Sequence, residues 1–228
     1  MRNILLCGNL PKEVIKALTD QGFLVISAPK NSWVDPRLQH HIDLQCCMGP
    51  QHILYVHQNF NTNLLNGVCS TIKTNICLNK EYPLDAPFNI CIKNGCCIYN
   101  PRTAAKQIID ACMQKGYNML PVRQGYTACS TLVVGNTLIT GDNGIARACS
   151  GAFDQVVIID PQKIVLPGFD HGFIGGCGFT CKDTLYLFGR LDKTPGCQQI
   201  AHVCRQNNYG LVELCNSPLQ DMGGCIVI

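Results

Sequence analysis

The sequence has little charge and no long apolar run. Only 14% of its 228 residues are charged, and the formal net charge is +3. The lysines and arginines are scattered along the chain, so the composition gives no support to nucleic-acid binding. No stretch approaches the ~18 uninterrupted apolar residues of a membrane-spanning helix, and the run Ile4–Cys7 is too short for a signal-peptide core. These absences predict a cytoplasmic protein that binds neither nucleic acid nor membrane.

Three short motifs are also missing. No two cysteines stand in C-x-x-C spacing, which argues against a zinc ribbon or a thioredoxin-type site. Neither G-x-G-x-x-G nor G-x-x-x-x-G-K occurs, so the turns of a nucleotide-binding sheet are not indicated. We therefore expect no metal and no cofactor.

Cysteine, in contrast, is abundant. The chain contains seventeen cysteines, an odd number, in a sequence too long for a small disulfide scaffold. This pattern favours reduced thiols. Hydrophobic residues make up 46% of the chain, which is enough for a real core.

A helix followed by a strand recurs along the chain. Apolar residues at helical spacing predict helices over Pro11–Gln21, Thr103–Lys115 and Gly196–Asn208, and each helix runs into a strand. Two weaker copies begin at Asn61 and Asn143. Five copies at a period of about 45 residues indicate a repeat architecture.

Each copy is followed by a short segment that ends in cysteine, and in a ring of five units these cysteines would gather near the centre. They are Cys46, Cys91, Cys129, Cys177 and Cys225. The strand Asn3–Cys7 would then pair with the C-terminal strand and leave no open sheet edge.

We therefore predict an α/β fold, a five-fold pseudo-symmetric β/α propeller of strand-rich units with outer helices. Residues 1–228 form one domain, with units at about 9–57, 58–100, 101–142, 143–190 and 191–228, closed by strand 2–8. The alternative is an ordinary open α/β sheet with helices on both faces.

Several strings carry a resemblance to a known family. They are 124–131 (QGYTACST), 139–145 (ITGDNGI) and 166–176 (LPGFDHGFIGG), together with His41-Ile42-Asp43. With these strings the chain resembles the pentein, or β/α-propeller, superfamily, and within it a small bacterial branch. The superfamily includes guanidino-group-modifying enzymes and a non-enzymatic ribosome anti-association factor. For this branch the resemblance implies the fold and no particular activity.

The resemblance to the enzymes of the superfamily also implies roles for single residues. In those enzymes a thiolate attacks an amidine carbon, a histidine moves protons, and carboxylates bind the guanidinium cation. By position, Cys225 resembles the nucleophile and His171 the proton carrier. The residues that would contact the substrate are His41, Asp43, Tyr126, Cys129, Asp170, Cys177 and Asp221, with Cys129 and Cys177 as alternative nucleophiles.

The sequence is compatible with two classes of function. One is a cysteine-dependent hydrolase or transferase of a small cationic guanidine or amidine. The other is a non-catalytic module that binds a ligand or partner on the same scaffold, in which the cysteines are small buried hydrophobes.

Overall fold

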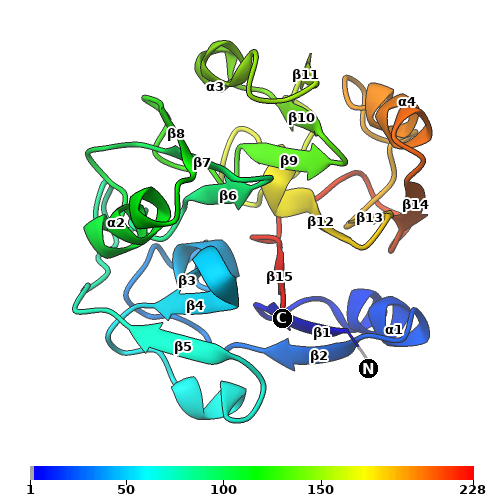
Figure 1. The fold of residues 1–228 in the computed structure, drawn as a ribbon. Coiled ribbons are helices and arrows are strands. Elements are labelled where there is room, and N and C mark those ends of the chain that lie inside the picture. The colour runs from blue at the N-terminus through cyan, green and yellow to red at the C-terminus, as the bar shows by residue number, and fades with distance from the viewer. Residues whose placement is uncertain (1–2) are drawn as a thin grey trace.

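The structure is a computed structural model that describes residues 3–228, so residue 2 of the predicted closing strand lies outside the described residues. The chain forms five three-stranded sheets, each with the same plan. A middle strand pairs antiparallel with a first strand and parallel with a third. Figure 1 shows the five sheets arranged around a common centre, with the first strands on the inside and the helices outside.

The strands are short and regular in length. The first strands are β3 (Cys46–Met48), β6 (Cys91–Lys93), β9 (Thr131–Val134), β12 (Gly178–Cys181) and β15 (Cys225–Val227). The middle strands are β4 (Ile53–Val56), β7 (Cys96–Tyr99), β10 (Thr137–Thr140), β13 (Thr184–Leu187) and β1 (Ile4–Cys7). The third strands are β5 (Ser70–Lys73), β8 (Asn118–Pro121), β11 (Gln155–Ile158), β14 (Gly210–Glu213) and β2 (Leu24–Ser27).

A helix fills the crossover between the middle and third strand of every sheet. Four crossovers hold the α-helices α1 (Lys12–Asp20), α2 (Lys106–Gln114), α3 (Asn143–Cys149) and α4 (Gln199–Gln206). The fifth holds a 3₁₀-helix, η3 (Thr62–Leu65), where the sequence shows one of its weaker copies. Further 3₁₀ turns are η1 (Ile42–Leu44), η2 (Pro50–His52) and η4 (Ile174–Cys177). None of the helices within residues 3–228 has the length and apolar character to cross a membrane.

The apolar spacing of the sequence explains how the helices pack. In α2, Ile108 and Cys112 are fully buried and lie one turn apart, so one face of the helix covers its sheet. The helix gives way to β8 at Gly116, whose φ of 72° lies in the left-handed region that glycine adopts without strain. The predicted helix therefore exists, although it begins at Lys106 and not at Thr103.

The core consists of five apolar clusters, each between two neighbouring sheets. One cluster, for example, joins Leu6 of β1 to Leu54 and Val56 of β4, and another joins Leu5 of β1 to Phe179 of β12. The other three link the sheets of β4 and β7, of β7 and β10, and of β10 and β13. Every sheet thus packs against two others, and the packing forms a closed cycle.

Pairing of the chain's first and last strands completes this cycle. β1 lies antiparallel to β15, with Leu5 opposite Val227 and Leu6 opposite Ile226. In Figure 1 the red β15 lies beside the blue β1. The pairing is the one that the sequence predicts for its N-terminal strand.

The five recurrent cysteines, however, do not occupy equivalent positions relative to their strands, although Cys46, Cys91 and Cys225 line one cavity. Cys46 and Cys225 lie opposite the last residue of a middle strand, whereas Cys91 lies opposite Ile98, the residue before the last in its middle strand. Cys129 and Cys177 precede their strands. Since side chains alternate between the faces of a strand, a shift of one residue turns a sulfur to the other face. Four of the five thiols therefore pack in four different apolar clusters, and Cys129 lies in none.

Because packing between the sheets closes the cycle, removing a buried side chain between two sheets should destabilise the protein. Leu6→Ala, which removes a fully buried side chain between the sheets of β1 and β4, should lower the free energy of unfolding by about 2 to 5 kcal/mol. Leu24→Ala, at a position on the neighbouring strand that is 47% exposed, should cost less than about 1 kcal/mol. Urea denaturation measures both, and equal costs would contradict the packing described.

Candidate functional site

The candidate site is built from the connections between sheets. The five connections run from β2 to β3, β5 to β6, β8 to β9, β11 to β12 and β14 to β15. Each contributes polar side chains to one region: His41 and Asp43, Asn89, Cys129, His171, and Asp221 respectively. Residues far apart in the sequence therefore meet because the connections converge.

His41 and Asp43 are held by the turn that leads into β3. Asp43 lies in η1, which is closed by the backbone bond from Gln45 N–H to Ile42 carbonyl oxygen, 2.9 Å. The buried Gln45 amide also reaches the carbonyl oxygen of His41 at 3.5 Å. The turn presents both side chains inward, with 7% of His41 and 13% of Asp43 exposed.

Cys129 is fixed by an asparagine from the neighbouring connection. The Asn89 amide nitrogen donates to Cys129 Sγ at 2.9 Å, and the Asn89 oxygen accepts the Cys129 backbone N–H at 3.0 Å. The Cys129 thiol in turn donates to Asp43 Oδ2 at 2.7 Å. Because Asn89 occupies the acceptor side of the sulfur, the S–H bond is aimed at the carboxylate.

Asp221 completes the group from the last connection. Its Oδ2 accepts the backbone N–H of Phe173 at 2.9 Å, and its Oδ1 accepts that of Gly223 at 3.1 Å. His41 Nδ1 lies 3.7 Å from Asp221 Oδ1 and 3.9 Å from Asp43 Oδ1. The imidazole therefore lies between two carboxylates, one of which contacts a thiol.

Glycines allow this close approach. A Cβ atom on Gly176 would collide with the Asp221 carboxylate, and one on Gly223 would collide with His41. Gly223 also has a φ of 76°, in the left-handed region. The glycine-rich stretch Gly172–Gly178 thus lets the backbone approach a buried carboxylate, as strand glycines do where something must come close.

Burial raises the pKa values of the two acids and of the thiol in this group. It raises the pKa of Asp43 to about 6, with His41 acting in the opposite direction and Asp221 adding to the rise. It also raises the pKa of Asp221, again against the effect of His41. The Cys129 pKa lies well above its ordinary value because the thiol is buried and faces Asp43 and Asp221. The resting thiol is therefore protonated.

One polar atom of the group has no partner. Asp43 Oδ1 is buried and makes no hydrogen bond within residues 3–228, whereas Oδ2 is occupied by Cys129. A buried acceptor without a donor costs free energy. The group is therefore poised to accept one more donor.

A cavity of about 250 Å³ opens beside Cys129. It is lined by His41, Tyr126, Cys129, Asp170, His171 and Asp221 together with apolar side chains that include Phe169 and Phe173. Among residues 3–228, its walls carry two acidic side chains and two histidines and no lysine or arginine.

An aromatic wall borders this cavity. The rings of Tyr126 and Phe173 are stacked with centroids 6.2 Å apart, and the Tyr126 hydroxyl donates to Asp85 Oδ2 at 2.7 Å.

The tautomer of His171 follows from its hydrogen bond. His171 Nδ1 lies 2.9 Å from the Gly172 carbonyl oxygen, which can only accept, so the proton is on Nδ1. The other ring nitrogen of a neutral His171 is then free to accept.

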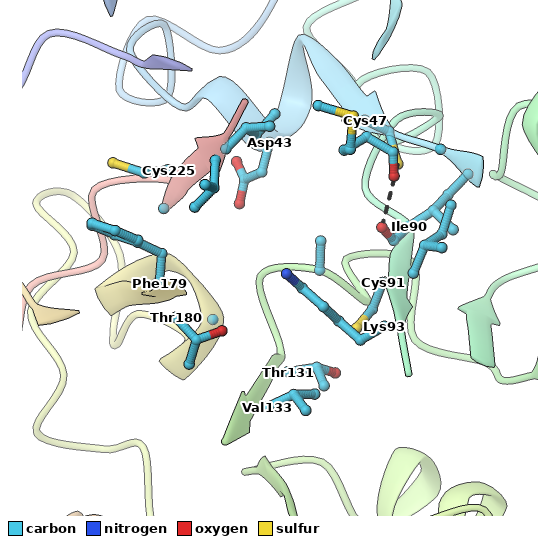
Figure 2. Close-up of a pocket in the computed structure, with 18 of the residues that line it drawn as sticks. Asp43, Cys47, Ile90, Cys91, Lys93, Thr131, Val133, Phe179, Thr180 and Cys225 are labelled. Atoms are coloured by element: carbon cyan, nitrogen blue, oxygen red, sulfur yellow. Dashed lines mark hydrogen bonds between the residues drawn. The ribbon is translucent and has the colours of Figure 1, made fainter. Parts of the chain in front are cut away.

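A larger cavity of about 620 Å³ lies on the other side of Asp43. It is lined by Asp43, Cys46, Cys91, Lys93, Thr131 and Cys225, among others. Figure 2 shows Asp43 and Lys93 extending into this cavity, whereas the sulfur of Cys225 points away from it. Asp43 faces the larger cavity and Cys129 the smaller one, so their hydrogen bond forms part of the wall between them.

The structure brings together seven of the nine predicted site residues. His41, Tyr126, Cys129, Asp170, His171 and Asp221 line the smaller cavity, and Asp43 contacts Cys129. Cys177 is fully buried, and its thiol donates to the Phe173 carbonyl oxygen at 3.2 Å. The predicted pair of Cys225 and His171 is not brought together, because the two residues line different cavities.

Sequence reasoning missed Asn89 and Asp85, which hold Cys129 and Tyr126. The only sequence signal for Asn89 is its place two residues before β6, which matches the place of Cys129 before β9. Within residues 3–228, no three histidine, cysteine or acidic side chains are arranged to hold a metal ion.

Solved structures with a similar fold are enzymes of guanidino compounds. A DDAH from Pseudomonas aeruginosa in complex with citrulline aligns with a TM-score of 0.58 and 10% identity, over 98% of this chain and 94% of that chain. A dimethylarginine dimethylaminohydrolase adduct with S-methyl-L-thiocitrulline gives 0.59 and 9%, over 98% and 94%. Agmatine deiminase from C. jejuni gives 0.59 and 8%, over 99% and 92%. These enzymes belong to the pentein superfamily, and this chain shares their fold.

Sequence comparison gives a family without an activity. A search of curated proteins finds no match. One family model, described as "Family of unknown function (DUF6873)", matches residues 5–226. That match spans nearly the whole described chain, and the protein belongs to the DUF6873 family.

Proposed function

We propose that this protein is a cysteine-dependent hydrolase or transferase of a small guanidine or amidine compound. The observation that carries the proposal is the Cys129 thiol, which donates to Asp43 inside a group that also contains His41 and Asp221. A nucleophile next to a proton acceptor, which is itself beside an imidazole, is the arrangement that nucleophilic catalysis requires.

The electrostatics of the smaller cavity favour a cation as substrate. Asp170 and Asp221 line it, and no lysine or arginine of the described residues 3–228 does. A planar guanidinium pairs well with carboxylates through parallel hydrogen bonds, and it stacks on aromatic faces. Tyr126 and Phe173 supply such faces. S-methyl-L-thiocitrulline, the ligand of one similar structure, carries an amidine-like isothiourea group, which supports this substrate class.

The geometry supports one route for the reaction. A bound cation would offset the negative charges that raise the Cys129 pKa, so that the thiol proton could pass to Asp43 over their hydrogen bond. The thiolate would attack the amidine carbon to form a C–S bond. The amine would leave with a proton from a histidine of the cavity, His171 or His41, and water would then release the product and restore the thiol.

We assign the nucleophile to Cys129 and not to Cys225. Cys129 shares a cavity with both histidines, whereas the Cys225 sulfur points away from its own cavity, as Figure 2 shows. His171 keeps the role that the resemblance implies, and Asp43 becomes the proton acceptor.

The proposal also includes the wider architecture. We take the chain as one domain, a five-fold pseudo-symmetric β/α propeller with units near 9–57, 58–100, 101–142, 143–190 and 191–228, which the closed cycle of packed sheets supports. All seventeen cysteines are free thiols, which favours a reducing compartment such as the cytoplasm. No partner beyond a small cationic ligand is proposed.

A thiol-directed haloacetamidine tests the site, because the amidinium carries the reagent to a cysteine in an anionic cavity. We expect Cys129 to be modified fastest, and citrulline or agmatine to slow this modification. His171→Ala and His41→Ala should lower the rate at Cys129 by about 100-fold or more. Peptide mapping by mass spectrometry after short exposure identifies the modified residue.

Cys77, an exposed thiol outside the cavity, gives the matched control. Cys77→Ala should leave the rate at Cys129 unchanged, and Cys129→Ala should remove the fast phase. Equal and slow modification of many cysteines, with no protection by any of these compounds, would refute the proposal in favour of a non-catalytic scaffold.

The raised pKa of Asp43 predicts a stability that depends on pH. Because its folded pKa is about 6 and its ordinary value is 3.8, the folded protein holds this proton more tightly than the unfolded chain does. That stabilisation is complete below about pH 4 and is lost as the pH rises through about 6. Asp43→Asn should therefore raise the free energy of unfolding at pH 8, by up to about 3 kcal/mol, and have little effect at pH 4.

Urea denaturation at pH 8 and pH 4 measures this difference. Asp154→Asn, at an exposed position, should change neither value. The same variant, Asp43→Asn, should slow the modification of Cys129 because it can no longer accept the thiol proton. A loss of stability in Asp43→Asn at pH 8 would contradict the electrostatic argument.

A further inference from the structure

Cys7 and Cys225 lie directly opposite each other where the ends of the chain meet. They are paired residues of β1 and β15, and both belong to the apolar cluster between the sheets of β1 and β12. Cys7 is fully buried, and Cys225 is half-buried at the edge of the larger cavity.

The hydrogen-bond pattern of the two strands brings these side chains close. Ile228 N–H donates to the Ile4 carbonyl oxygen at 2.9 Å, which marks a hydrogen-bonded pair of residues. Such pairs alternate along antiparallel strands, so Cys7 and Cys225, three pairs further on, occupy a non-hydrogen-bonded position. Cα atoms are ~4.5 Å apart at these positions, within the range of about 4.4 to about 6.8 Å that disulfides span.

The two side chains lie on the same face of the sheet and in one apolar cluster. Figure 2 shows the Cys225 sulfur directed away from the larger cavity, and the Cys7 thiol lies 3.8 Å from the Ile26 carbonyl oxygen. Burial raises the pKa of Cys225, and the neighbouring Cys225 thiol lowers the pKa of Cys7.

This sheet differs from the other four in how its strands are connected. In the others, the first and middle strands follow each other in the chain, and a turn joins them. β1 and β15 come from opposite ends of the chain, and three residue pairs hold them. Three of the other sheets have no cysteine pair at the matching position: Cys46 faces Val56, Thr131 faces Thr140, and Gly178 faces Leu187. In the fourth, the pair nearest to this position is Cys91 with Ile98.

We propose that Cys7 and Cys225 form a reversible disulfide site that, when oxidised, fixes the first strand covalently to the last. The oxidant is a peroxide. A thiolate of the pair attacks one peroxide oxygen and becomes a sulfenic acid while the other oxygen leaves as water; the second thiol then attacks that sulfur, forms the S–S bond and releases a second water. A dithiol reverses the change.

The bond would act on the strand pair that holds the ring closed. It would close a loop of nearly the whole chain, which is where a disulfide restricts the unfolded chain most. It would also anchor the segment just after Asp221 and Gly223, whose backbone lies against His41. The inference rests on the strand register, the shared apolar cluster and the direction of the Cys225 sulfur, and it does not depend on the proposed function.

Oxidation of the full chain with hydrogen peroxide tests the site. Digestion without reductant should yield a linked peptide pair that contains residues 7 and 225. The unfolding temperature should rise by about 10 °C on oxidation and return with dithiothreitol. Both changes should be absent from Cys7→Ala and from Cys225→Ala.

Cys97 and Cys112 form the rival pair, since both are fully buried in the same apolar cluster. Cys97→Ala should keep the linked peptide and the temperature rise. Absence of the linkage between residues 7 and 225 in the oxidised wild-type chain would overturn the proposal, and this readout stands even if the alanine variants fail to fold. A temperature rise that persists in Cys7→Ala would overturn it as well.

Discussion

The structure depends on the pairing of β1 with β15. In the four other sheets the first and middle strands are tied by the turn between them, but here only main-chain hydrogen bonds and packed side chains hold the two strands. β1 contributes to two of the five apolar clusters, one on each side of its sheet. Loss of this pairing would expose both clusters and leave two open sheet edges.

Closure also determines the geometry of the site. The last connection between sheets carries Asp221 and ends at β15, so the register of β15 on β1 places this carboxylate against Gly176 and near His41. The resulting group contains two buried acids, a protonated thiol and a carboxylate oxygen without a donor. The buried acids and the acceptor that has no donor among residues 3–228 cost free energy, so stability alone does not account for this group. Groups whose burial lowers stability in this way are typical of functional sites, where function and stability conflict.

The sequence predicted the helices and the strand closure because both follow from periodicity. Apolar spacing located α1, α2 and α4 to within a few residues, and an unassigned apolar strand at the N-terminus pointed to the partner of β15. The residues that line the smaller cavity were named through a resemblance, with His41 and Asp43 carried by one short string. These features are visible in local patterns of residue type.

Details that depend on register were not predictable in the same way. Cysteines that look alike in the sequence fall at different places relative to their strands, and one residue of offset reverses the direction of a side chain. Cys129 lies two residues before its strand, in the connection that lines the smaller cavity, whereas Cys225 lies within β15 opposite Cys7 and lines the larger one. Asn89 was missed because an asparagine before a strand is ordinarily a turn residue, and only the folded chain brings it to a sulfur.

The candidate site is made entirely of connections between sheets, and this has a consequence for how such proteins diverge. Strands and helices carry the packing, so substitutions in the connections can change what the cavity accepts while leaving the framework intact. Enzymes with 8 to 10% identity to this chain still share its fold over more than nine-tenths of their length. Because the framework does not depend on the side chains of its five connections, the residues around the cavity can be changed one segment at a time.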